Sequence, residues 1–147
     1  MHAWFTFSLI ALLLWGCWGL FDKIATSYMD PKSVAMFVGP VSFMISLGLL
    51  ASVHFRPELH PHGVVFALLG ALAAGFGGVA YIYAISTGNI AVVVTVTSLY
   101  PPVTMFLSWL FLQETITPKK LLGIALAVLA VVLLSVEAAS EPSLRQE

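Results

Sequence analysis

Five long, continuous apolar segments constrain this chain more than any other feature of its sequence. They cover residues 4–25, 33–53, 63–85, 90–112 and 120–136. About 20 apolar residues in helical form cross the hydrocarbon core of a bilayer, and a helix satisfies its own backbone hydrogen bonds there. Strands of outer-membrane barrels would instead show alternating polarity over about ten residues. The sequence therefore predicts an all-α fold, a polytopic membrane protein of five transmembrane helices.

The charge content agrees with this class and excludes others. Hydrophobic residues make up 60% of the chain and charged residues only 9%, with six Lys and Arg against seven Asp and Glu. A chain without a basic run has no means of neutralising a phosphate backbone, so we expect no nucleic-acid partner. The first segment lacks a preceding Lys or Arg and is long for a signal peptide, which indicates a retained span. We predict one membrane domain over residues 1–137, a polar tail over 138–147, and location in the cell membrane.

Short connections between the segments contain helix-start signals. Asp30 followed by Pro31 offers an N-cap and then proline at the first helical position, and Thr117 followed by Pro118 repeats the pattern. The sequence STGN at residues 86–89 combines a turn glycine with a cap residue. These signals predict helix starts near Pro31 and Pro118 and a tight turn between the third and fourth spans.

The distribution of basic residues leaves the orientation of the chain open. Cytoplasmic loops normally carry the excess of Lys and Arg. Three basic residues fall on the side of the N-terminus and three on the opposite side. They are Arg56, Lys119 and Lys120 on the first side, and Lys23, Lys32 and Arg145 on the second. Either one weak signal fixes a single orientation, or the chain inserts in both orientations.

One face of the first span contains candidate pathway residues. Ser8, Ala11, Trp15, Trp18 and Asp22 are spaced by three or four residues and therefore share a helix face. Two tryptophans would give a cavity aromatic walls suited to apolar, aromatic or cationic solutes. Alternatively, the tryptophans pack against a neighbouring helix or face lipid, and the acidic residue lies at the interface.

Small residues on two spans predict close helix packing. Gly16 and Gly19 lie beside the tryptophans, and Gly70, Ala74 and Gly78 follow one another at four-residue spacing in the third span. Small side chains allow transmembrane helices to approach closely. We therefore predict that these positions are helix contacts.

The fourth span combines hydroxyl groups with two adjacent prolines. Prolines remove backbone donors and bend a helix, which leaves carbonyl groups beside the hydroxyls of the same face. That face can bind a solute, although a hydroxyl can equally bond to its own helix. The candidate residues are Thr97, Tyr100, Pro101, Thr104 and Ser108.

Metal and enzyme chemistry have little support in the sequence. His60 and His62 lie in a short loop with only Glu58 nearby as a further ligand, so we predict no metal site and no cofactor. No histidine or aspartate occupies the middle of a span, as intramembrane hydrolysis would require. We therefore do not expect an enzyme.

Several sequence stretches, taken in order, resemble a known family. SLYPPVT at residues 98–104, FLQETITP at 111–118 and LGIAL at 122–126 follow an opening helix that contains Trp15, Gly16 and Lys23. Together they resemble the EamA-like branch of the drug/metabolite transporter superfamily, and the resemblance covers nearly the whole chain.

The resemblance implies a specific architecture. Such transporters typically contain two five-span repeats of opposite orientation with a central pathway, and their relative motion gives alternating access. This chain resembles one repeat, so an antiparallel homodimer or a paired homologous subunit would restore the second. The chain lacks the first-span glutamate of the small multidrug exporters, and Asp22 lies near the end of its span.

The residues and the resemblance together predict a half-size transporter subunit. It would sit in the lipid bilayer and move a small organic metabolite or drug-like solute, by efflux after dimerisation. Two alternatives remain: a non-transporting assembly subunit of a larger membrane complex, and a small multidrug exporter.

Overall fold

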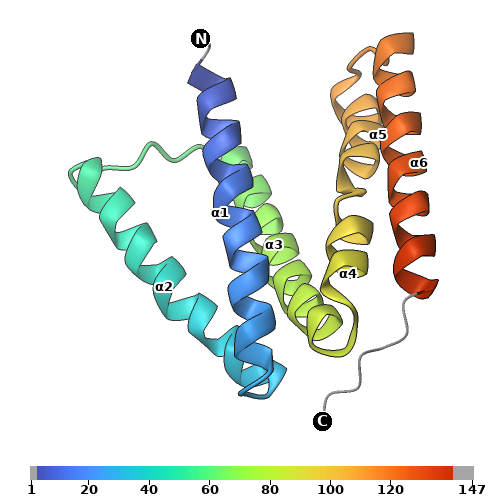
Figure 1. Cartoon of the computed structure of the whole chain (residues 1–147). Coiled ribbons are helices and arrows are strands. Elements are labelled where there is room, and N and C mark those ends of the chain that lie inside the picture. Colours follow the sequence, from blue (N-terminus) through green and yellow to red (C-terminus); the bar gives the residue numbers. More distant parts are fainter. Residues whose placement is uncertain (1–2, 141–147) are drawn as a thin grey trace. The chain divides into compact units, whose positions relative to one another are not determined.

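The computed structural model describes residues 3–140, except for the side chains of residues 134, 135 and 137–140. Within this part of the chain the regular structure is entirely helical (Figure 1). The helices are α1 (Ala3–Thr26), α2 (Pro31–Ser52), α3 (Pro61–Thr87), α4 (Ile90–Thr97), α5 (Tyr100–Leu112) and α6 (Pro118–Ser140). The predicted all-α membrane fold is confirmed, and residues 141–147 of the predicted tail, Arg145 included, lie outside the described residues.

The helices have the lengths and surfaces that lipid requires. Three unbroken helices, α1, α2 and α3, and the segment Ile90–Leu112 are long and apolar enough to cross a membrane. Helix α6 has 23 residues, which also suffices by length. Large apolar side chains such as Phe7, Leu13 and Phe43 are mostly exposed, which would be unfavourable in water and is expected against acyl chains.

The cap residues explain where three helices begin. The Asp30 carboxylate accepts a hydrogen bond from the backbone N–H of Lys32 at 3.0 Å, and Pro31 opens α2. The Asn89 side chain accepts from the N–H of Ala91 at 2.8 Å at the start of α4. Helix α6 begins at Pro118, where the predicted proline start is confirmed, two residues before the predicted span. Each cap satisfies a backbone donor that the first helical turn leaves unpaired.

The fourth span is broken into two helices. Helix α4 ends at Thr97, where the N–H groups of Ser98 and Leu99 donate to the carbonyls of Val94 and Val96. Helix α5 then starts at Tyr100 with prolines in its first turn, where missing N–H groups cost no helical hydrogen bond. The predicted bend is therefore a complete interruption of the helix. Helix α2 also contains a proline, Pro40, yet it runs continuously from Pro31 to Ser52.

The helices form two compact units, α1 to α3 within Met1–Thr87 and α4 to α6 within Gly88–Glu147. In the first unit α1, α2 and α3 all contact one another, and Val34, Ile82 and Ile85 are buried. In the second unit α4 packs against α6, where Val131 is buried. The single domain over residues 1–137 stays a prediction.

Candidate functional site

Helix α1 contacts α3 through an aromatic pair. The rings of Trp18 and Tyr81 pack with centroids 4.9 Å apart and planes tilted by 31°. Gly19 is buried at this contact, and a Cβ atom there would lie 2.5 Å from the Tyr81 hydroxyl oxygen. The absence of a side chain at Gly19 therefore allows the tyrosine to reach α1, as small residues do in membrane helix packing.

A lysine makes a second contact between the same helices. The ammonium of Lys23 donates a hydrogen bond to the Ile85 carbonyl at 2.7 Å, across 62 residues of sequence. This carbonyl lies in the last turn of α3, where helical carbonyls have no partner within the helix and a positive charge is favourable. Lys23 thus joins the end of α1 to the end of α3.

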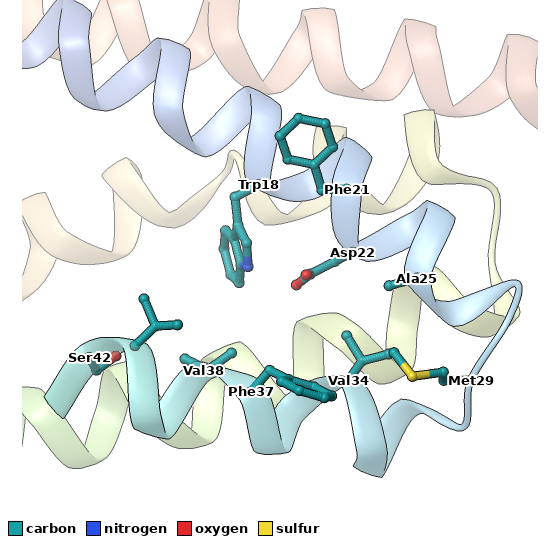
Figure 2. A pocket seen from close by; sticks show the side chains of 10 residues that line it. Trp18, Phe21, Asp22, Ala25, Met29, Val34, Phe37, Val38 and Ser42 are labelled. Atoms are coloured by element: carbon teal, nitrogen blue, oxygen red, sulfur yellow. The ribbon is translucent and has the colours of Figure 1, made fainter. Parts of the chain in front are cut away.

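An open pocket of about 500 Å³ lies between α1 and α2 (Figure 2). Its volume falls in the range of small-molecule sites, about 300–1,000 Å³. Met29, in the short turn between the two helices, contributes its side chain to the lining. The lining residues are Trp18, Phe21, Asp22, Ala25, Met29, Val34, Phe37, Val38, Val41 and Ser42.

Asp22 gives this mostly apolar pocket its charge. Its Oδ2 atom is buried, and no described residue makes a hydrogen bond to that atom. The Trp18 side chain lies within hydrogen-bonding reach of the carboxylate, one helical turn away, and Figure 2 shows both side chains pointing toward α2. A carboxylate held among apolar side chains strongly favours a donor or a positive charge as a partner.

The structure places some candidate residues of the first span in the pocket lining and others outside it. Trp18 and Asp22 line the pocket, whereas Trp15 is 60% exposed and lies outside the lining, and their part in a solute pathway stays a prediction. Among the packing glycines, Gly19 makes the close approach described above. A Cβ atom on Gly16, Gly70 or Gly78 would meet no described atom within 4 Å. Ala74 is likewise exposed. Packing at these other positions stays a prediction.

The fourth-span candidates lie in the second unit. The Thr97 hydroxyl donates to the carbonyls of Val93 and Val94 at 2.8 and 3.1 Å, so this group bonds to its own helix. Tyr100, Pro101 and Thr104 are exposed, and Ser108 is half-buried. Their part in a solute pathway stays a prediction.

Comparison with known proteins decides the family. The sequence matches the EamA-like transporter family over residues 2–136. The chain belongs to the EamA-like transporter family. This match confirms the resemblance noted in the sequence, to a family that belongs to the drug/metabolite transporter superfamily. Members of this family are transporters and not enzymes.

A curated relative adds a comparison of length. An uncharacterized protein of Methanocaldococcus jannaschii is 34% identical over 73 residues, which cover 50% of this chain and 53% of the relative. The match therefore spans about half the length of that protein. No solved structure matches the chain.

Sequence reasoning did not find the α2 side of the pocket in this EamA-like protein. Val34, Phe37, Val38 and Val41 follow the spacing i, i+3, i+4 and i+7, which marks one face of a helix. This signal is weak in a membrane segment because nearly every position is apolar. Tyr81, which packs on the Trp18 ring, is likewise absent from the candidates that the sequence offers.

The sequence predicts no metal site at His60 and His62. The rings of His60 and His62 lie 5.7 Å apart. Among the described residues no group of three or more His, Cys, Asp or Glu side chains is placed to hold a metal ion.

Proposed function

We propose that this EamA-like protein is a half-size transporter subunit that exports a small organic solute from the cell. The subunit would work by alternating access in the cell membrane, after pairing with a second copy or a homologous subunit. The observation that carries the proposal is the pocket between α1 and α2, in which Trp18 and Asp22 lie among apolar side chains. A few polar groups in an apolar cavity are typical of sites that bind small organic molecules.

The contacts around the pocket suit a site whose walls move relative to one another. Helix α1 is joined to α3 through Lys23 and through the Trp18–Tyr81 pair, and the opposite wall of the pocket belongs to α2, which contacts both α1 and α3. A shift of α2 relative to the α1–α3 pair would change the width of the pocket. Alternating access itself would come from motion of the whole subunit relative to the subunit paired with it.

Transport by the purified chain tests the proposal directly. Proteoliposomes containing the full chain should take up members of a panel of radiolabelled amines, amino acids, nucleosides and sugars. We expect Trp18→Leu and Asp22→Asn each to lower the uptake rate by about tenfold, because each removes a pocket contact worth roughly 1–2 kcal/mol. Glu114→Gln, a carboxylate-to-amide change in the second unit, is the control. Uptake that both pocket variants leave unchanged would exclude this pocket as the pathway, and no uptake of any panel member would favour a non-transporting assembly subunit.

Accessibility labelling tests the antiparallel pairing. Ser27 precedes α2 and Glu58 follows it, so Ser27→Cys and Glu58→Cys place a thiol at each end of that span. Each change is made in a Cys17→Ala chain, and a membrane-impermeant maleimide is applied to intact and to permeabilised cells. We expect both thiols to label to roughly half in intact cells, because the basic residues do not bias the orientation. Complete labelling of one thiol and none of the other would overturn the antiparallel homodimer.

A further inference from the structure

The pocket between α1 and α2 carries one negative group and no basic one. Asp22 is the sole ionisable residue among the ten that line it. Lys23 is its neighbour in sequence, yet the Lys23 ammonium donates to the Ile85 carbonyl on α3. The buried Oδ2 atom of Asp22 has no hydrogen-bond partner among the described residues. The pocket therefore contains an acceptor that the helices around it leave unsatisfied.

We infer that this pocket binds a small organic cation with an aromatic or apolar body. The inference rests on the proposed function and names the class of solute for the same site. A cation would place its charge at the Asp22 carboxylate and its body against Phe37 and Val38 on α2 (Figure 2). The positive charge of the solute would compensate the Asp22 carboxylate, whose Oδ2 atom is buried, and burial strengthens electrostatic attraction.

The Trp18 ring adds a second attraction for a cation. Tyr81 packs against this ring, yet the Trp18 side chain remains 36% exposed and lines the pocket one helical turn from Asp22. An indole face attracts positive charge, most strongly where the site is desolvated. A carboxylate and an indole on the same face of α1 therefore favour the same kind of solute.

Other solute classes fit this chemistry poorly. An anion would be repelled by Asp22, because the lining supplies no lysine, arginine or histidine to offset the negative charge. A neutral apolar molecule would cover the buried carboxylate oxygen without giving it a partner, which is costly in a site of low dielectric constant. A sugar would meet mostly aliphatic and aromatic groups, with the hydroxyl of Ser42 as a further polar contact.

A matched pair of probes separates charge from shape. The full chain in lipid nanodiscs is titrated calorimetrically with (3-hydroxyphenyl)trimethylammonium and with its neutral carbon isostere 3-tert-butylphenol, and empty nanodiscs supply the background. We expect the cation to bind at least about tenfold more tightly than the isostere, because only the cation compensates Asp22. Equal binding of the two, or binding of neither, would overturn the inference, and equal binding would indicate an apolar occupant such as a lipid tail.

Three variants in the pocket and one control outside it locate the interaction. Asp22→Asn should weaken cation binding by about tenfold or more, and Asp22→Glu should retain most of it because the charge is kept. Trp18→Leu should weaken it by about threefold to tenfold. Glu58→Gln removes a carboxylate outside the pocket and should change binding by less than about twofold. Full binding by Asp22→Asn would place the cation elsewhere. If that variant does not fold, the two probes on the unaltered chain still decide the question.

Failure of this inference can be told apart from failure of the proposed function. If proteoliposomes transport a neutral or anionic solute but bind no cation at this pocket, the proposed transport function stands and the inferred cationic solute class is overturned. If a cation binds with the expected dependence on Asp22 but no paired form of the chain transports it, the inferred cation site stands and the proposed transport function fails.

Discussion

Serine and threonine hydroxyls donate to carbonyls of their own helix in both compact units, as at Ser46 and Thr97, but a long-range polar contact between helices is described in the first unit. In Met1–Thr87, Lys23 reaches a carbonyl 62 residues away and Trp18 packs on Tyr81, so polar and aromatic groups of α1 fix its contact with α3. In Gly88–Glu147, the hydroxyls of Thr97 and Ser98 donate to carbonyls three or four residues earlier. The comparison teaches that a polar group in a membrane span can form a contact with another helix or a hydrogen bond within its own helix. Which of the two it forms depends on the residues that lie next to it in space.

The largest effect should come from the tightest contact of the first unit. Gly19→Ala adds a Cβ atom 2.5 Å from the Tyr81 hydroxyl oxygen, and Tyr81 is held against Trp18. We expect a loss of about 1–3 kcal/mol in the free energy of unfolding, measured by SDS titration of mixed micelles. Gly16→Ala, with no described atom within 4 Å, should cost nothing and is the control.

A second change sharpens this prediction. Tyr81→Phe removes the oxygen that the new methyl group would meet, and the next atom, Cζ, lies at an ordinary 3.7 Å. The double variant Gly19→Ala, Tyr81→Phe should therefore regain most of the stability relative to Tyr81→Phe alone. An additive loss would show that the α1–α3 contact does not depend on this pair.

The lysine contact comes next in size. Lys23→Met keeps the length of the side chain but removes the donor to the Ile85 carbonyl. Hydrogen bonds from charged groups contribute about 1.5–3 kcal/mol, and because this one is only part-buried we expect a loss at the lower end of that range in the same SDS titration. Lys32→Met, at an exposed site in the first turn of α2, is the matched control. If both variants unfold at the same SDS fraction, the long-range bond does not stabilise the unit.

In the second unit the prolines should matter for motion more than for stability. Replacing Pro101 and Pro102 together by alanine restores two backbone donors, which allows one helix to run through the interruption at Ser98 and Leu99. We expect the transport rate to fall about tenfold, which corresponds to about 1.4 kcal/mol in the activation free energy. Spin labels at residues 93 and 108 should show a changed separation. Unaltered separation and rate would mean that the prolines do not cause the break.

The smallest effect should come from the Thr97 hydroxyl. Thr97→Val removes a hydrogen bond to carbonyls of its own helix while keeping the shape of the side chain. We expect a change below about 0.5 kcal/mol in unfolding and an unaltered transport rate, because these carbonyls gain little from an extra local donor. A large loss of transport would place this hydroxyl in contact with the solute and would weaken the contrast between the two units.

The sequence predicts the local features of the fold well. Asp30 with Pro31 and Thr117 with Pro118 mark helix starts, and the paired prolines mark the interruption, because each signal acts through neighbouring backbone groups. The long-range features are harder to predict. The Ile85 carbonyl that binds Lys23 belongs to the backbone, which every residue possesses, and so it leaves no trace in the sequence.

The sequence predicts the α1 side of the candidate site but not its α2 side. Trp18 and Asp22 stand out because an indole and a carboxylate are uncommon in an apolar segment. Their partners on α2, Phe37 and Val38 among them, resemble the lipid-facing residues around them. In a soluble protein an apolar stripe would indicate the inner face of a helix, but here lipid accepts apolar side chains on every face.

The break between Thr97 and Tyr100 has a consequence for membrane insertion. Helix α4 has 8 residues and α5 has 13, which extend only about 12 Å and 20 Å at 1.5 Å per residue. Neither crosses a hydrocarbon core of roughly 30 Å alone, so the two must enter the bilayer as one unit. The thickness of the bilayer thus fixes the combined depth of the two helices of the interrupted span. Rotation at the junction between them leaves this depth unchanged, so it is the movement with the lowest free-energy cost.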